Sequence, residues 1–294
     1  MSESAEPQAG ILAPLPPLAR YLTFALVDES RVREALRTLR DQVDPEAVVG
    51  FGESLVESLD ANVPGLRPFP SLAGAGVEIP ASPGSLWLWL RGDDRGDLIL
   101  TTRRLTALLA SAFEPIAIVD AFNHGGRDLT GYQDGTENPV GEAAIAAALV
   151  TDKGAGLNGS SFVAIQQWQH DLKRFEAMSP HDQDNAVGRR RLDNEELDDA
   201  PDSSHVKRTA QESFSPEAFV WRRSMPWANE SRHGLQFVSF GHSFDGFEAQ
   251  LRRMTGLEDG ITDALFTFTR PTTGNYFWCP PLRDGKLDLS ILGL

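Results

Sequence analysis

The sequence predicts an α+β fold made of two tandem ferredoxin-like units, in which antiparallel sheets are flanked by helices. Short apolar segments typical of strands alternate along the chain with amphipathic segments of helical spacing. The order strand, helix, strand, strand, helix, strand can be traced twice, and that order is typical of a ferredoxin-like unit. A chain of 294 residues is also long enough for two such units. We place them at residues 1–135 and 136–294.

In the first unit, residues 21–27 have the composition of a strand. The next segment predicts a helix with Ser30 as its N-cap. Residues 50–84 are rich in Gly and Pro and hold one short strand near Leu55 and Val56. The apolar face of the helix has the i, i+3, i+4, i+7 spacing and consists of Val32, Ala35, Leu36 and Leu39.

The first unit continues with residues 86–90, a strand with large apolar side chains on both faces, which predicts that both faces are covered. A helix is expected over residues 102–113, and another strand over residues 116–122. The apolar positions of that helix are Leu105, Leu108, Leu109 and Phe113. Residues 123–158 are expected to link the two units.

In the second unit, residues 162–168 predict a strand, followed by a short amphipathic helix and a polar insertion at residues 179–202. Residues 235–241 predict the next strand, and a helix with an aligned apolar face follows it. The unit is expected to end with a strand at residues 265–269 and an apolar hairpin at residues 276–278. The apolar positions of the two helices are Leu172, Phe175 and Met178, then Phe247, Leu251 and Met254.

The composition is that of a globular protein, with 41% hydrophobic and 23% charged residues and no apolar run long enough to cross a bilayer. The formal net charge of −15 argues against nucleic-acid and anionic-membrane partners, which require clustered Lys and Arg. Cys279 is the only cysteine, so an intrachain disulfide is excluded. Residues 1–10 lack the regions of an export signal, which predicts a cytoplasmic protein with a short disordered tail.

Six histidines are present, and any of them could be a surface residue or a hydrogen-bonded core residue. His205 lies in a segment without a strand or helix pattern, where ligands are common. An imidazole that binds iron through one nitrogen, while a carboxylate holds the other, is the arrangement of haem peroxidases. The carboxylate strengthens the imidazole as a donor. His205 is therefore the candidate iron ligand.

The loop of residues 131–139 contains Asp134 in an Asp-Gly pair. Its side chain could bond its own backbone as an ordinary turn residue. Alternatively, its carboxylate could move a proton between two peroxide oxygens. Arg222 could form a surface salt bridge, or it could stabilise the charge that develops as an O–O bond breaks. A carboxylate, an imidazole and a guanidinium in this order can make a haem site that activates peroxide.

The segment Gly131-Tyr132-Gln133-Asp134-Gly135-Thr136 resembles the Gly-x-x-Asp-Gly-Thr signature of the dye-decolourising haem peroxidases. Other segments resemble the same family, in the expected order and over nearly the whole chain. They are Asp128-Leu129-Thr130, Trp168-x-His170-Asp171-Leu172, Val187-Gly188-Arg189-Arg190, Ser204-His205-x-x-Arg208, Arg222-x-Ser224-x-Pro226 and Thr272-Thr273-Gly274-x-Tyr276-Phe277. The compact length resembles the cytoplasmic bacterial branch, whose fold is two ferredoxin-like halves with haem in the C-terminal half.

This resemblance implies that the cofactor is haem b, bound non-covalently, since a single cysteine excludes attachment through a Cys-x-x-Cys-His motif. By position, His205 resembles the proximal iron ligand and Asp134 the distal acid–base group. Arg222 stands where the family has its distal arginine. Ser224 stands where the family has Asn or Ser, and is taken as the third member of the catalytic set, with Asp134 and Arg222.

The carboxylate partner of His205 is expected to be Asp263, with Asp259 and Glu217 as nearby alternatives. Arg208 and Arg189 are candidates for binding the haem propionates. Their alternative role is an exposed guanidinium paired with the acidic run at residues 193–202.

Asn138 and Glu137 are expected to line the propionate side of the site. Phe240, Phe237 and Leu265 are candidates for packing against the haem edge. Their alternative role is ordinary packing in the core.

The resemblance further implies an enzyme that reduces hydrogen peroxide and oxidises dyes, phenols or other aromatic donors in one-electron steps through a ferryl intermediate. A homo-oligomer, from a dimer to a hexamer, is expected because family members assemble in this way. Two other functions stay open at this stage. One is a haem- or porphyrin-handling protein, either a carrier or an iron-releasing enzyme, that uses the same pocket. The other is a metal-free binding module on the same scaffold.

Overall fold

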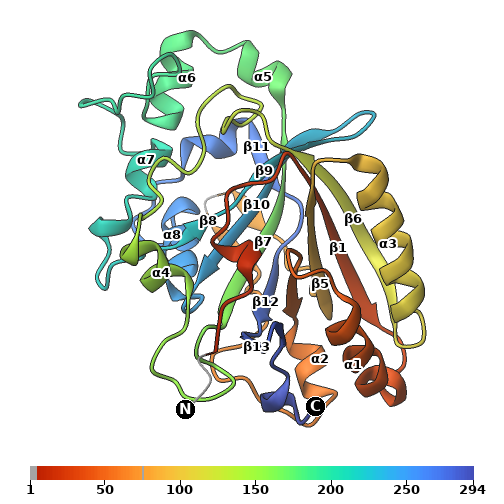
Figure 1. The fold of residues 1–294 in the computed structure, drawn as a ribbon. Coiled ribbons are helices and arrows are strands. Elements are labelled where there is room, and N and C mark those ends of the chain that lie inside the picture. The colour runs from red at the N-terminus through yellow and green to blue at the C-terminus, as the bar shows by residue number, and fades with distance from the viewer. Residues whose placement is uncertain (1–4, 75) are drawn as a thin grey trace.

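The N-terminal half of the structure is a four-stranded antiparallel sheet with helices on its outer side (Figure 1). The computed structural model describes residues 5–74 and 76–294 of the chain. The main elements occur in the β-α-β-β-α-β order of a ferredoxin-like fold: β1 (Leu18–Leu26), α1 (Val32–Gln42), β2 (Val48–Phe51), β5 (Leu86–Gly92), α3 (Arg95–Leu109) and β6 (Phe113–Phe122). Smaller elements accompany them: η1 (Ala9–Ile11), η2 (Glu29–Arg31), α2 (Glu53–Glu57), β3 (Leu72–Gly74) and β4 (Val77–Ile79).

The C-terminal half contains a second four-stranded antiparallel sheet. Its main elements are β7 (Ser161–His170), α5 (Leu172–Glu176), α6 (Pro180–Val187), β9 (Met225–Ala228), β10 (His233–Gly241), α8 (Asp245–Met254) and β12 (Asn275–Cys279). The shorter elements are α4 (Glu142–Ala148), α7 (His205–Arg208), η3 (Gln211–Ser213), β8 (Trp221–Arg222), η4 (Ala264–Thr267), β11 (Thr269–Pro271), β13 (Leu282–Arg283), β14 (Lys286–Leu287) and η5 (Ser290–Leu292).

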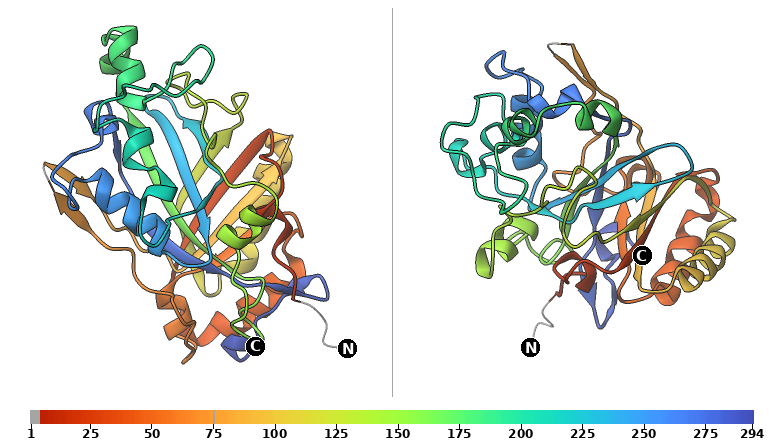
Figure 2. Two further views of the ribbon diagram at one scale, coloured as in Figure 1. Left: turned by 90° about the vertical axis from the view of Figure 1, so that its left-hand side faces the viewer. Right: turned by 90° about the horizontal axis from the view of Figure 1, so that it is seen from above.

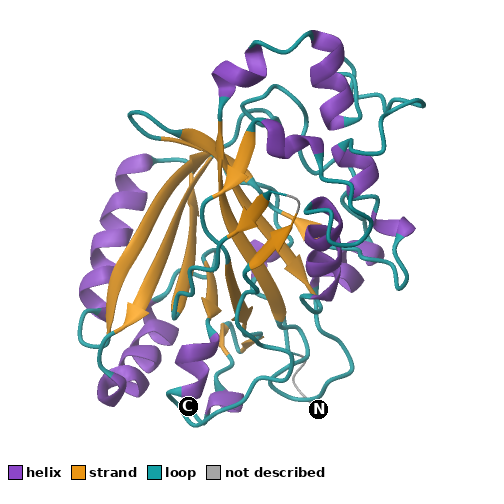
Figure 3. Ribbon diagram, turned by 180° about the vertical axis from the view of Figure 1, so that it is seen from behind, coloured by secondary structure: helices purple, strands orange, loops and turns teal. Residues whose placement is uncertain are grey.

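The two sheets join into one, in the order β11-β7-β12-β2-β5-β1-β6-β9-β10-β8. A further pairing between β7 and β10 closes the strands from β7 to β10 into a ring. Each join between the halves is a single residue pair, Trp278 with Phe51 and Ala121 with Trp227. Figures 2 and 3 show the helices on the outside of these strands, with those of the two halves on opposite sides.

The interior of the ring is filled by a cluster of buried side chains that both halves contribute. Alternate residues of each strand point into it, as the pleat requires. Five aromatic rings stack there, and their successive centroids lie 5.8 to 6.2 Å apart: Phe277, Trp87, Tyr21, Trp89 and Phe240. A second cluster lies between the strands and the outer helices.

Several predicted elements are confirmed. The strands at residues 21–27, 86–90, 116–122, 162–168 and 235–241 correspond to β1, β5, β6, β7 and β10. The apolar face predicted for α1 is buried, as is that of α8. The mixed helix and antiparallel sheet architecture agrees with the predicted α+β class. None of the helices in the described residues has the length and apolar character needed to cross a bilayer.

Two predictions in the first half are wrong, and a third has the wrong bounds. Ser30 does not cap α1: it lies in the short 3₁₀ helix η2 that leads into α1, and the carboxylate of Asp28 caps η2 by accepting a hydrogen bond from the Ser30 backbone. Residues 55–56 lie in α2, and the strand lies earlier, in β2, where all four residues are buried. The helix predicted at residues 102–113 is α3, which starts after its N-cap Asp94 and ends before β6 begins at Phe113.

In the second half, the strand predicted at residues 265–269 is largely the 3₁₀ helix η4, and β11 starts only at Thr269. The hairpin predicted at residues 276–278 is β12, which pairs with β7 and β2 inside the ring. Strand β9 was not expected, although it supplies the second strand of this half. Its four residues, Met-Pro-Trp-Ala, include a Pro that strand patterns disfavour.

The disordered tail predicted at residues 1–10 is corrected where the structure describes it. The side chain of Gln8 is 1% exposed, and its Nε2 donates to the carbonyl oxygens of Val49 and Pro280, both at 2.9 Å. Glu6 forms a bridge with Leu282. Residues 1–4 of the predicted tail lie outside the described residues.

Candidate active site

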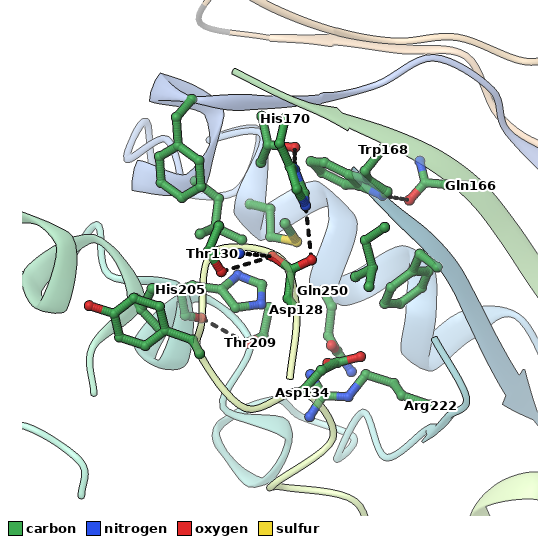
Figure 4. Close-up of a pocket in the computed structure, with 18 of the residues that line it drawn as sticks. Asp128, Thr130, Asp134, Gln166, Trp168, His170, His205, Thr209, Arg222 and Gln250 are labelled. Atoms are coloured by element: carbon green, nitrogen blue, oxygen red, sulfur yellow. Dashed lines mark hydrogen bonds and ion pairs between the residues drawn. The ribbon is translucent and has the colours of Figure 1, made fainter. Parts of the chain in front are cut away.

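A cavity lies between the outer face of the second sheet and helix α8 (Figure 4). Strand β7 contributes three alternate residues and β10 two, so each strand presents one face to it. Helix α8 contributes residues at the i, i+3, i+4, i+7 spacing. The loop of residues 123–139 lines another side. The sheet and helix residues at the wall are Gln166, Trp168, His170, Leu235, Phe237, Phe247, Gln250, Leu251 and Met254.

His205 is the first residue of α7 and lines the cavity. Its Nδ1 lies 2.7 Å from Oδ2 of Asp263, whose side chain is fully buried. The other carboxylate oxygen of Asp263 accepts a hydrogen bond of 2.8 Å from the backbone of Leu265. Both oxygens of Asp263 are thus committed, and they fix the orientation of the imidazole. Of the three candidate partners, the structure places Asp263 against His205.

Asp134 and Arg222 line the same cavity as His205. Neither side chain forms a hydrogen bond or an ion pair with any residue that the structure describes, and Arg222 Nε is buried. Gly131 and Gly135, with φ of +88° and +76°, give the Asp134 loop its turns. A carboxylate and a guanidinium without partners are therefore free to act on a ligand.

Asn138 holds the backbone of Arg222 from both sides. Its Nδ2 donates to the Arg222 carbonyl oxygen at 2.9 Å, and its Oδ1 accepts from the Arg222 amide at 2.8 Å. Ser224 lies in the next small cavity, which Asp134 also lines, and its Oγ accepts from the Val238 amide at 3.4 Å. Asn138 thus holds the Arg222 backbone in place, and Ser224 lines the small cavity but not the main one.

His170 and Asp128 form a second imidazole–carboxylate pair in the cavity wall. Nε2 of His170 lies 3.0 Å from Asp128 Oδ1, and Nδ1 lies 2.6 Å from Thr269 Oγ1. Burial alone would raise the pKa of Asp128, but the hydrogen bond and charge of His170, with help from Thr130, lower that pKa below its ordinary value. The pair ties the Asp134 loop to the sheet.

The two arginines expected at the propionates have different surroundings. Arg208 is buried and forms two hydrogen bonds of 2.7 Å with Asp259, whose pKa falls to about 2 mainly through that contact. Arg208 does not line the cavity, so its expected role there is corrected. Arg189 lines the adjoining hollow, together with His205, and pairs with Glu137 and Glu196. Of these two partners, only Glu196 belongs to the acidic run with which Arg189 could alternatively have paired.

Phe240 is also corrected. It is fully buried inside the ring and stacks on Trp89, because the pleat of β10 turns it to the face opposite Phe237. Phe237 and Leu265 do line the cavity. Of the three aromatic and aliphatic candidates, these two are therefore in place to contact a ligand.

Comparison with known proteins decides the family. The sequence model described as Dyp-type peroxidase, C-terminal, matches residues 125–284. The dye-decolorizing peroxidase of Mycobacterium tuberculosis is 31% identical over 92% of this chain and 88% of its own. The chain belongs to the Dyp-type peroxidase family. The corresponding protein of Mycolicibacterium paratuberculosis is also 31% identical, over 92% of this chain and 82% of its own.

Solved structures of Dyp-type peroxidases have the same fold. A dyp-type peroxidase protein from Shewanella oneidensis superposes with a TM-score of 0.89, at 28% identity and covering 98% of both chains. A variant of DypB from Rhodococcus jostii RHA1, in complex with heme, has a TM-score of 0.86 at 26% identity, covering 93% of this chain and 96% of its own. The predicted enzyme class, a peroxidase of this type, and the α+β class are confirmed.

Sequence reasoning assigned no role to several cavity residues of this Dyp-type peroxidase. Gln166, Trp168 and His170 alternate along β7, and the strand predicted at residues 162–168 already put the first two on one face, but it ended before His170. Polar side chains at alternate positions of an otherwise apolar strand were the available signal. Tyr132 was part of the motif. Two causes raise the pKa of its phenol: burial, which is the larger, and the hydrogen bond that the phenol donates to Asp184.

Proposed function

We propose that this chain is a haem b peroxidase that reduces hydrogen peroxide and oxidises aromatic donors in one-electron steps. The haem is held non-covalently in the C-terminal half, in the cavity beside His205. The observation that carries the proposal is the His205–Asp263 pair, which faces the same cavity as the unpaired side chains of Asp134 and Arg222. Heme-bound DypB structures among the relatives support the same cofactor.

The residues of the cavity suit a haem. His205 uses Nδ1 for Asp263, which leaves Nε2 for iron. Two buried polar atoms of wall residues, Gln166 Nε2 and Arg222 Nε, lack partners among the described residues, as expected where a polar ligand group belongs. The remaining wall is largely apolar and suits a porphyrin face: Val187, Leu235, Phe237, Leu251, Met254 and Leu265. Arg189, in the adjoining hollow, is the propionate candidate that remains.

Asp134 transfers a proton within the bound peroxide, and Arg222 stabilises the charge that forms when the O–O bond breaks. The Asp134 carboxylate accepts the proton of one peroxide oxygen and returns it to the other, which becomes the leaving water. Arg222 stabilises the negative charge on the departing oxygen. Asn138 fixes the Arg222 backbone, and Asp128 with His170 fixes the loop that carries Asp134. When bound, haem supplies the iron centre that stores the two oxidising equivalents.

The overall reaction consumes one peroxide, two electrons from two donors and two protons, and it yields two waters. Phenols, dyes and other aromatic molecules are the proposed donors. The proposed division into ferredoxin-like units at residues 1–135 and 136–294 is supported by the two four-stranded halves of the ring. A cytoplasmic location, a homo-oligomeric state, and the absence of nucleic-acid and membrane partners stay predictions from the sequence.

The test is to reconstitute wild type and His205→Ala with hemin, and to record absorption spectra before and after one equivalent of peroxide. Wild type should show a Soret band, react rapidly with peroxide and then oxidise a phenol such as guaiacol. His205→Ala should lose the band or shift it, and lose turnover. Haem binding without a peroxide reaction in wild type would instead favour the porphyrin-handling alternative. No Soret band in wild type would contradict the proposal.

A further inference from the structure

A second hollow lies on the other side of the cavity wall, with a volume of about 560 Å³. It is built at the ends of three neighbouring strands, where Arg270 of β11 is opposite Gln169 of β7, and Gln169 is opposite Gly234 of β10. Helix α5, which follows β7 directly, forms another side. Its position at the end of the sheet leaves it open to solvent.

The hollow is cationic. Three cations line it, Lys173 and Arg174 from α5 and Arg270 from β11, and the imidazole of His233 from β10 lines it too. None of these four side chains forms an ion pair within the described part of the chain. In contrast, Arg67, Arg189 and Arg208 each form an ion pair with a carboxylate. One carboxylate, Asp171, also lines the hollow and caps the start of α5. In a chain of net charge −15, a group of unpaired cations attracts an anion rather than a neighbouring side chain.

The base of the hollow is aromatic and is shared with the haem cavity. Phe266 and Phe268 line it, and the ring centroid of Phe266 lies 5.5 Å from that of Trp168 in the cavity wall. His170, Phe268 and Thr269 line both spaces. A single layer of side chains therefore separates the hollow from the cavity. A ring that stacked on Phe266 would be close enough to exchange electrons across that layer.

We propose that this hollow is the docking site for donors that are aromatic anions, with a carboxylate or sulfonate held by the cations and the ring against Phe266. The inference rests on the proposed peroxidase function. Each docked donor loses one electron across the wall and leaves as a radical. Two donors thus supply the two electrons that peroxide takes up, together with two protons (H⁺) from solution, when its O–O bond breaks and two waters form. A donor too large for the haem cavity would still react here.

Binding is measured first, without turnover. Naphthalene-1,5-disulfonate, which is not a donor, is titrated calorimetrically into haem-loaded wild type, Lys173→Glu, Arg270→Glu and the control Arg103→Glu, an exposed reversal on α3. Each reversal at the hollow removes one attraction and adds one repulsion, so it should raise Kd by about 3- to 10-fold. The control should match wild type. Equal affinities in all four proteins would overturn the proposal.

Turnover is measured second, with 1-naphthol-5-sulfonate compared with neutral 1-naphthol. Arg270→Glu should lower kcat/KM for the sulfonate by about 3- to 10-fold and leave that for 1-naphthol unchanged. The sulfonate value in wild type should also fall as salt is added. Equal losses for both donors would overturn the docking site. A wild type that binds the disulfonate but does not react with peroxide would contradict the peroxidase function and leave the binding result intact.

Discussion

Nδ1 of His205 lies 2.7 Å from the carboxylate of Asp263, which has no exposed surface. These residues are far apart in the sequence and meet because α7 and η4 lie side by side, with the Ala264 amide donating to the Ser203 carbonyl oxygen at 2.8 Å. A buried carboxylate on the far nitrogen makes the imidazole a stronger donor to a metal.

Asp263→Asn should therefore weaken haem retention. The substitution keeps the shape but removes the charge that polarises His205. We expect about a 10- to 100-fold loss in haem affinity or activity, and a higher iron reduction potential because the ferric state loses donation. Haem transfer to apomyoglobin measures haem retention, and spectroelectrochemistry measures the reduction potential. Glu217→Gln, at a carboxylate predicted from the sequence but not placed against His205, is the control. Unchanged retention and potential in Asp263→Asn would refute this role.

Substitution of Arg208 should mainly lower the stability of the fold, whereas substitution of Arg189 should mainly speed the loss of haem. Arg208→Leu removes a buried guanidinium and leaves Asp259 unpaired, so it should cost about 1.5–3 kcal/mol of stability. Arg189→Leu removes the arginine that lines the adjoining hollow and should accelerate haem loss with a smaller change in stability. Urea denaturation measures the stability of both variants, and haem transfer to apomyoglobin measures how fast each loses haem. If Arg208→Leu released haem faster than Arg189→Leu at equal stability, the assignment would be reversed.

The ionised Asp128 should stabilise the fold at neutral pH. Its pKa lies below the ordinary 3.8 in the folded state, so the unfolded state binds its proton first as pH falls. The stabilisation is complete above about pH 4 and disappears as pH falls through the folded pKa. Asp128→Asn should thus be less stable than wild type at pH 7, by an amount that shrinks towards pH 3. Urea denaturation at both pH values checks this, with exposed Glu176→Gln as the control. A gap that stayed constant would disprove the linkage.

Much of the fold could be predicted because its strands carry plain patterns. The apolar residues 86–90 of β5 predicted a strand covered on both faces. The apolar residues of α1 and α8 recur at clear helical spacing. Strand β9 and the 3₁₀ helix η4 were missed because their form depends on neighbours. β9 is a strand because it pairs with β10. η4 begins after Asp263, whose side chain caps it by accepting a hydrogen bond from the Leu265 amide.

The site was predicted in part. The motif residues Asp134, His205 and Arg222 do line one cavity. Phe240 was misplaced because a difference of three positions from Phe237 reverses its face on a strand, while the sequence signals for both are alike. Arg208 was misplaced because its partner Asp259 comes from a turn 51 residues away, a contact that no local pattern reports. The role of His170 depends on the same kind of long-range contact.

The most direct test of the account is the rate at which haem-loaded protein reacts with hydrogen peroxide, measured by stopped-flow on wild type, Asp134→Asn and Arg222→Leu. Arg103→Leu, an exposed change on α3, serves as the control. If Asp134 moves the proton and Arg222 stabilises the developing charge, each variant should keep its haem and its Soret band and react about 100-fold more slowly or worse. Rates within twofold of wild type for both variants would contradict the account.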